Sequence, residues 1–272
     1  MPDTITIKVS ERPVSITADT SLFSLREQMK PDADMAILNG APATEDSKLQ
    51  ENDEVVFIRR GEIPAPDELE ALMAARHTPG VHQVLKNATV GIAGLGGLGS
   101  SIALALCRIG VGRLVLVDFD VVEPSNLNRQ HYFTDQIGMM KTDALRATLE
   151  RVNPCVSLET HPLRLTPDNI PKIFASVDVL AEAFDRAEEK AMLIATAIQS
   201  LPNTPVVAAS GLAGYESANR IQTRKIRHNL YVCGDGESAA RPGQGLMAPR
   251  VGVAAHHQAN AIMRLLLNEK EM

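Results

Sequence analysis

The sequence predicts an α/β protein with a doubly wound, Rossmann-like, mostly parallel sheet, preceded by a small β-grasp domain. From residue 90 onward, short apolar segments that read as strands alternate with segments that read as helices. This alternation is typical of a parallel sheet with helices on both faces. A glycine-rich turn at residues 94–99 separates the first of these strands from its helix, and the residues before position 63 read as short strands around one helix.

The N-terminal region has the signals of a compact β-rich unit. Ser21 is a good N-cap, and Leu22, Leu25 and Met29 follow it at helical spacing. The dipeptide Asn39-Gly40 after a strand is a strong turn signal. Strands are expected at residues 4–9, 14–16, 35–38 and 55–58. Their order around the helix predicts the β-grasp arrangement.

Pro64 and Pro66 mark the end of this region. We therefore expect three parts, with the β-grasp domain at residues 1–63 and a linker and helix at 64–86. The larger α/β domain follows at 87–272.

The glycine-rich turn predicts a nucleotide-binding βαβ unit. A strand at residues 90–93 enters the turn, a helix of small residues follows at 100–109, and the next strand, 114–117, ends at Asp118. Such a turn lets backbone N–H groups approach a phosphate at the helix N-terminus, where the helix dipole favours an anion. A carboxylate at the next strand end can accept hydrogen bonds from a ribose. The glycines concerned are Gly94, Gly96, Gly97 and Gly99.

The remaining strands of the sheet are expected at residues 157–160, 177–180 and 206–209, with helices at 187–198 and 251–267 and a further helix after Lys141. Residues 234–245 are rich in small residues, which suggests a mobile loop. Ligands of such sheets gather at the C-terminal ends of the strands, where both Asp118 and Asp185 fall.

The composition excludes several classes of function. The formal charge is -6 and no basic run occurs, so no nucleic-acid partner is expected. No apolar stretch of about 18 residues and no secretory signal is present, so we expect no membrane association and a cytoplasmic protein. The three cysteines, Cys107, Cys155 and Cys233, are widely spaced. That fits a reducing compartment and leaves no four-cysteine zinc site, so no zinc is expected.

Arg129, Lys141 and Asp185 together point to chemistry on a polyphosphate. Two cations can neutralise a triphosphate, and a carboxylate can hold Mg²⁺. Taken singly, either cation is more typical of a solvated surface charge. An enzyme that attacks an α-phosphate with a carboxylate uses all three groups, whereas hydride transfer needs none of them.

Several motifs of the larger domain occur together in one known family. They are the glycine turn, Asp118-Phe119-Asp120, Asn126-Leu127-Asn128-Arg129-Gln130, Lys141 and Asp185. Together they resemble the ThiF/MoeB superfamily, which is related to the ubiquitin-activating enzymes, over about residues 68–267. The N-terminal domain resembles the sulfur carrier ThiS, and the combination is most similar to ThiF-type ThiS adenylyltransferases of thiamine biosynthesis.

The resemblance implies that the larger domain is an ATP-binding adenylyltransferase. It would adenylate the C-terminal glycine of a ubiquitin-like sulfur-carrier protein of the ThiS type with ATP and Mg²⁺, and it would act as a homodimer. Arg129, Lys141 and Asp185 would be the catalytic residues, with Asp185 holding Mg²⁺. The glycines, Asp118, Asp120, Ser125, Asn126, Arg129 and Lys141 would bind the nucleotide, with Asp118 on the ribose and Asn126 and Arg129 on the β- and γ-phosphates.

The chain departs from this family at informative positions. The family's paired CxxC zinc motifs are absent, and Arg241 stands where relatives place a cysteine. Cys233 is either a displaced nucleophile or an inert residue, and the inert interpretation is favoured because nothing in the sequence argues for a lowered thiol pKa. Arg186 follows Asp185 where relatives usually have Asn. Gly61 continues into Glu62, so the β-grasp domain has no free C-terminal carboxylate and is expected to serve docking, dimer contact or stability.

Three other interpretations remain open. An NAD-dependent oxidoreductase would use the same glycine turn and Asp118 but would leave Arg129, Lys141 and Asp185 idle. A non-catalytic scaffold would use its ThiS-like domain to occupy a carrier-binding groove. Within the adenylating class, a MoeB-like or tRNA-modifying relative is the remaining alternative.

Overall fold

In the computed structural model, which describes residues 3–227 and 229–271, the chain forms two compact units, Met1–His77 and Thr78–Met272. The division falls inside residues 64–86, the range expected to be a linker and helix. Helix α2 (Pro66–Ala74) belongs to the first unit, and helix α3 (Val81–Lys86) belongs to the second.

The first unit is a mixed five-stranded sheet with one helix. The strand order is β2-β1-β5-β3-β4, and β1 and β5 pair in parallel while the other pairs are antiparallel. The elements are β1 (Thr4–Val9), β2 (Arg12–Thr17), α1 (Leu22–Met29), β3 (Met35–Leu38), β4 (Ala41–Pro42) and β5 (Glu54–Ile58). Ser21 caps α1 by accepting from the N–H of Ser24, as its sequence position predicts. Leu22 and Leu25 of α1 are buried in a core with Ile7, Val55 and Phe57 of the sheet.

The second unit is built on a seven-stranded sheet with the order β11-β12-β10-β9-β6-β7-β8. Every neighbouring pair is parallel except β11 and β12, so the prediction of a mostly parallel sheet is confirmed. The strands are β6 (Thr89–Ala93), β7 (Arg113–Val117), β8 (Ser157–His161), β9 (Val179–Glu182), β10 (Val206–Ala209), β11 (Gln222–Arg227) and β12 (Leu230–Gly234).

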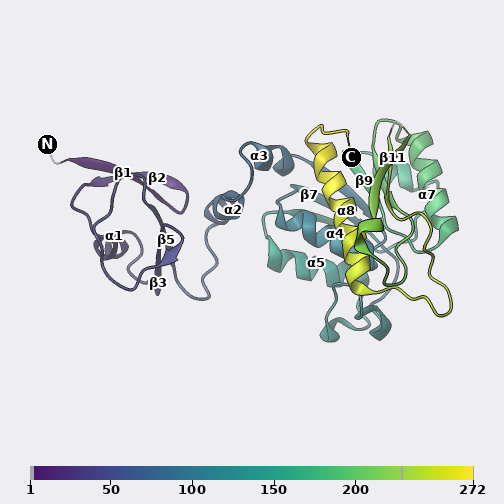
Figure 1. The fold of residues 1–272 in the computed structure, drawn as a ribbon, viewed down its shortest axis with the longest axis horizontal. Helices are drawn as coiled ribbons and strands as arrows, with labels where there is room; N and C mark the ends of the chain where they lie inside the picture. Colours follow the sequence, from purple (N-terminus) through teal and green to yellow (C-terminus); the bar gives the residue numbers. More distant parts are fainter. Residues whose placement is uncertain (1–2, 228, 272) are drawn as a thin grey trace. The chain divides into compact units, whose positions relative to one another are not determined.

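Helices cover both faces of this sheet (Figure 1). Helices α4 (Gly97–Arg108), α5 (Lys141–Val152) and α8 (Ala248–Leu266) pack on one face, around Ile102, Leu145 and Ile262. Helices α6 (Ile170–Ile173) and α7 (Ala187–Ser200) pack on the other face, around Phe174 and Leu193. Because these strands are buried on both faces, their sequences are continuous runs of apolar residues rather than alternating apolar and polar residues.

The sheet reverses its winding direction between β6 and β9. From β6 the chain proceeds outward through β7 to β8, and it then returns to the other side of β6 to lay down β9 and β10. Ligands of doubly wound sheets bind at such a switch point, beyond the carboxyl ends of the strands. Gly94 follows β6 and Asp185 follows β9, so the glycine turn and the predicted magnesium ligand both lie at this point.

Several features differ from the sequence prediction. Strands β4 and β12 and helix α6 were not expected from the sequence. The antiparallel edge strand β11 was not expected, because its sequence Gln-Thr-Arg-Lys-Ile-Arg is mostly polar and exposed. Helix α4 begins at Gly97 rather than at residue 100, so the last glycines of the turn already lie in the helix. None of the helices formed by the described residues combines the length and the apolar character that a membrane span requires.

Candidate nucleotide-binding site

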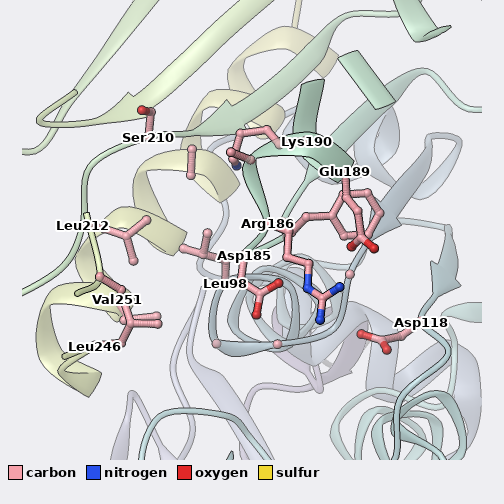
Figure 2. A pocket seen from close by; sticks show the side chains of 18 of the residues that line it. Leu98, Asp118, Asp185, Arg186, Glu189, Lys190, Ser210, Leu212, Leu246 and Val251 are labelled. Carbon is pink, nitrogen blue, oxygen red and sulfur yellow. The ribbon is translucent and has the colours of Figure 1, made fainter. Parts of the chain in front are cut away.

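A cavity of about 790 Å³ opens at the switch point of the sheet. Its walls come from the glycine turn, the residues after β7, β9 and β10, and the start of α8 (Figure 2). The predicted site residues that line it are Gly94, Gly96, Gly97, Asp118, Asp120, Arg129, Lys141 and Asp185. Gly99, Ser125 and Asn126 do not line it.

At two positions of the turn, the backbone conformation or the lack of room for a Cβ atom requires glycine. Gly94 has a φ of +90°, and a Cβ there would lie 2.9 Å from the carbonyl oxygen of Ala183. A Cβ on Gly99 would lie 1.8 Å from the carbonyl oxygen of Gly94, so only glycine lets α4 start this close to the turn. Gly99 therefore shapes the site through packing rather than by facing the cavity.

Asp118 lines the cavity and also holds the glycine turn through hydrogen bonds. Its Oδ2 accepts from the N–H of Leu95 at 2.6 Å, and its Oδ1 accepts from the N–H of Asp120 at 2.8 Å. Burial raises the pKa of Asp118, and the positive charge of Lys141 opposes that shift. The hydroxyl of Tyr132 donates to the carbonyl of Leu95 at 2.7 Å and holds the turn from its other side.

Lys141 is the first residue of α5 and is held beside the cavity. Its Nζ lies 2.9 Å from Oδ2 of Asp120, and its backbone N–H donates to the carbonyl of Asp120. The Lys141 side chain is only 7% exposed, whereas that of Asp120 is 50% exposed. The two predicted binding residues are therefore a preformed pair at the end of β7.

Arg129 reaches the cavity from the loop between β7 and α5. Its Nη1 donates to Oδ1 of Asn128 at 2.9 Å and to the carbonyl of Ser125 at 3.3 Å, so its charge faces no carboxylate among the described residues. Asn126 is buried and its Oδ1 accepts from the N–H of Glu123, which caps the short helical turn that carries Ser125. Ser125 and Asn126 thus support Arg129 in this structure rather than facing the cavity.

Asp185 and Arg186 face the cavity between β9 and α7. Both side chains are exposed, and Figure 2 shows the Arg186 guanidinium between the carboxylates of Asp185 and Asp118. Arg186 is the N-cap residue of α7 and has extended backbone angles there.

A buried ion pair behind Asp185 was missed by the sequence analysis. Glu182, the last residue of β9, is fully buried; its carboxylate accepts from Lys190 and from the N–H groups of Phe184 and Ala209. Burial raises the pKa of Glu182, and Lys190 opposes the shift. The pair ties β9, β10 and α7 together at the floor of the cavity. An acid inside an otherwise apolar strand was the available signal, but its partner is not identifiable from spacing.

A second buried ion pair, Asp235 with Arg250, lies next in sequence to residues that line the cavity. Asp235, directly after β12, accepts from Arg250 Nη2 at 2.6 Å and from the N–H groups of Glu237 and Ser238, each at 2.8 Å. Although burial acts to raise it, the pKa of Asp235 is lowered by these hydrogen bonds. Arg250 Nη1 also donates to the carbonyls of Glu216 and Ser217. One side chain at the start of α8 thus fixes two loops beside the cavity.

Cys233 is fully buried in β12, and burial raises the pKa of its thiol to about 11. Its Sγ lies 3.4 Å from the hydroxyl of Thr223, which in turn lies 3.1 Å from Nδ1 of His257. A protonated, buried thiol is a poor nucleophile, so these contacts support the inert interpretation of Cys233.

The cavity fits a magnesium nucleotide in size and in chemistry. Pockets of about 300–1,000 Å³ are usual for small-molecule ligands. Gln130 lines the cavity, and its buried Oε1 has no hydrogen-bond partner among the described residues. No group of three or more His, Cys, Asp or Glu residues in the described part of the chain is placed to hold a metal ion. The exposed carboxylate of Asp185 lines the cavity, and Mg²⁺ is usually bound by one or two carboxylates together with phosphate oxygens and water.

Relatives of known sequence match part of this chain. The adenylyltransferase and sulfurtransferase UBA4 of Eremothecium gossypii is 33% identical over 189 residues, which are 67% of this chain and 42% of the relative. The ubiquitin-like modifier-activating enzyme 5 of Oryza sativa subsp. japonica is 45% identical over 85 residues, 31% of this chain and 20% of the relative. The chain therefore spans less than half the length of these relatives.

The fold also has solved counterparts. E. coli tRNA N6-threonylcarbamoyladenosine dehydratase, TcdA, in complex with ATP superposes with a TM-score of 0.66 at 22% identity, over 72% of this chain and 93% of that one. The model of the ThiS-like ubiquitin family matches residues 5–61, and the model of the ThiF family matches residues 70–272. Since the second match covers most of the sequence, this chain belongs to the ThiF family.

Proposed function

We propose that this protein is an adenylyltransferase that activates the C-terminal glycine of a ubiquitin-like sulfur-carrier protein with MgATP and releases pyrophosphate. One observation carries the proposal. In a ThiF-family chain, a glycine turn, the predicted cations Arg129 and Lys141, and three aspartates line a single cavity at the switch point of the sheet. An oxidoreductase of the same fold class would have no use for Arg129, Lys141 and Asp185 there.

The proposed reaction is a displacement at the α-phosphate. An oxygen of the carrier's terminal carboxylate attacks phosphorus, the bond from phosphorus to the bridging oxygen of the β-phosphate breaks, and pyrophosphate leaves with the electron pair. No proton transfer is needed, because both nucleophile and leaving group are anions. Asp118 would accept hydrogen bonds from the ribose, and Arg129 and Lys141 would neutralise the polyphosphate.

Asp185 would hold the magnesium ion. When bound, Mg²⁺ neutralises charge on the departing pyrophosphate. The exposed carboxylate of Asp185 supports this role, because it keeps its oxygens available beside the phosphate-binding turn.

The carrier would be a separate protein rather than the fused ThiS-like domain. Gly61 of that domain is joined to Glu62, whose carboxylate lies 2.7 Å from Nζ of Lys30 in the same unit. The domain therefore offers no terminal carboxylate to ATP. The fused domain supports a sulfur carrier of the ThiS type as the substrate and hence a role in thiamine biosynthesis. The alternative is a MoeB-like or tRNA-modifying role, to which the names of the similar UBA4 and TcdA proteins point.

We further infer that the protein acts as a homodimer. Five large apolar side chains between residues 119 and 139 are 39–51% exposed: Phe119, Val121, Phe133, Ile137 and Met139. Exposed apolar groups concentrated in one segment are typical of a protein–protein interface. Light scattering after size-exclusion chromatography tests this inference, and a monomer at micromolar concentration contradicts it.

The adenylation itself is tested by incubating the protein with MgATP and separate candidate carriers, followed by mass spectrometry of the carrier. A carrier acyl-adenylate with matching pyrophosphate release is expected with a ThiS-type carrier. Transfer to a MoeB-type carrier or to tRNA instead would select the alternative. Absence of carrier-dependent exchange between ATP and pyrophosphate for all candidates would contradict the proposed activity.

A control without added carrier tests the ThiS-like domain. The mass of the chain is expected to stay unchanged with MgATP alone, because no terminal carboxylate follows Gly61. An adenylate on this chain would show that its own ThiS-like domain is the substrate.

A further inference from the structure

Arg186 is a cation in the cavity that the family motifs leave without a role. It follows Asp185 directly, begins α7 as its N-cap residue, and lines the cavity with an exposed side chain. In Figure 2 its guanidinium lies between the carboxylates of Asp118 and Asp185 and points into the open part of the cavity. Its backbone is fixed by the start of α7, whereas its charged end is free.

Most other cations of the cavity are already engaged by carboxylates. Lys141 pairs with Asp120 at 2.9 Å, and Lys190 pairs with the buried Glu182. Arg164 lies 3.5 Å from Glu189 and stacks over the ring of Phe119 at 4.6 Å. The guanidinium of Arg186, by contrast, makes no hydrogen bond or ion pair with any residue in the described ranges 3–227 and 229–271. Its charge is available to a ligand without breaking an existing contact.

The position of Arg186 between two acids indicates which part of a nucleotide it faces. Under the proposed function, Asp118 binds the ribose and Asp185 holds the metal beside the outer phosphates. The α-phosphate joins these two parts of ATP, so it lies between the two aspartates. A guanidinium can bind two phosphate oxygens at once through its fork of N–H donors.

We propose that Arg186 binds the α-phosphate and stabilises the charge that develops there as the carrier carboxylate attacks. This role rests on the proposed adenylation but assigns a new residue to it. The N–H groups of Arg186 donate to the two non-bridging oxygens of the α-phosphate. The contact is present in ATP, in AMP and in the acyl-adenylate, and it is absent from adenosine.

The test compares the binding of adenosine, AMP and MgATP by isothermal titration calorimetry to the full chain and its variants. Arg186→Ala is expected to weaken AMP and MgATP binding by roughly tenfold or more, the range for a charge-assisted hydrogen bond, and to leave adenosine binding within about twofold. Arg186→Lys is expected to restore part of the loss, because Lys supplies a charge without the fork. Arg151→Ala removes another exposed arginine, which lies outside the cavity, and is expected to change none of the affinities.

The outcomes separate this inference from the proposed function. If the wild-type chain binds MgATP and Arg186→Ala binds AMP normally, the α-phosphate assignment is wrong and the proposed function stands. If adenosine binding falls as much as AMP binding, Arg186 supports the shape of the cavity rather than the phosphate, which also overturns the assignment. If the wild-type chain binds no nucleotide, both the assignment of Arg186 and the proposed function are wrong.

Discussion

Asp235 and Asp185 both follow strands of the same sheet, and Asp185 lines the cavity that residues 236–240 also line, yet the surroundings of the two carboxylates differ completely. Asp235 accepts from Arg250, from two backbone N–H groups and from the Ser238 hydroxyl, and its side chain is 2% exposed. Asp185 is exposed and faces the open cavity. An acid at the end of a parallel strand is thus not by itself a ligand-binding residue. Its role depends on whether backbone N–H groups and a buried cation already satisfy it.

Asp118 combines features of both. It is buried and accepts from two backbone N–H groups, as Asp235 does, yet it lines the cavity, as Asp185 does. The comparison therefore predicts three kinds of variant: one that loses stability, one that loses activity, and one that loses some of both.

The largest effect is expected from Asp235→Asn, which leaves the buried charge of Arg250 without its partner. Breaking a buried ion pair by removing one member costs about 3–5 kcal/mol of unfolding free energy, and urea denaturation measures it. Glu237→Gln is the matched control, because Glu237 forms a surface ion pair with Arg220 and is 74% exposed. Such pairs contribute at most about 1 kcal/mol. Equal losses in the two variants would contradict the structural role of Asp235.

The contribution of the Asp235–Arg250 pair to stability depends on pH in a defined direction. Because the folded-state pKa of Asp235 is lowered, its contribution is fully present above the unfolded pKa of about 3.9 and is lost as the pH falls through the folded value. The stability difference between wild type and Asp235→Asn should therefore be constant between pH 7 and pH 5 and shrink only under more acidic conditions. A difference that shrinks already near pH 6 would point to another titrating group.

Asp185→Ala and Arg129→Ala are expected to reduce adenylation by roughly 10² to 10³, the effect of removing one group that stabilises developing charge. Neither side chain forms a hydrogen bond or ion pair with a buried residue among the described residues, so the melting temperature should stay normal. Pyrophosphate release with the carrier measures the loss. Asp168→Ala removes an exposed aspartate outside the cavity and serves as the control. Near-normal turnover of a normally melting Asp185→Ala or Arg129→Ala protein would rule out that residue's assignment.

Asp118→Ala is expected to lie between these cases. It leaves the N–H groups of Leu95 and Asp120 without their acceptor, which costs about 1–3 kcal/mol of unfolding free energy. It also removes the proposed ribose contact, so adenosine binding should weaken as well. Calorimetry with adenosine and a denaturation curve measure the two losses on the same protein. Loss of stability with unchanged adenosine binding would mean that Asp118 shapes the turn and does not bind the ribose.

These contrasts also explain which parts of the fold and of the site could be predicted from the sequence. Local patterns were sufficient for the glycine turn, the alternating strands and helices, and the acid after β7, because each depends on neighbouring residues. Glu182 with Lys190 and Asp235 with Arg250 were not found, because each pair joins elements whose contact depends on the folded sheet. Strand β11 was missed because an exposed edge strand has no apolar alternation.

The smallest effect is expected from Cys233→Ser, which tests whether the end of β12 is structural throughout. The thiol is buried, and its raised pKa keeps it protonated at neutral pH. The proposed adenylation requires no protein thiol, because the carrier's carboxylate would attack the α-phosphate. Serine keeps a contact with the hydroxyl of Thr223, so we expect normal pyrophosphate release and a slightly lowered melting temperature. Assaying pyrophosphate release and carrier thiocarboxylate on the same variant separates the two steps. Loss of pyrophosphate release in the folded variant would mean that β12 contributes directly to adenylation. Loss of thiocarboxylate alone would mean that the strand opens during the reaction to expose a nucleophile, since a thiol acts in acyl transfer only as an accessible thiolate.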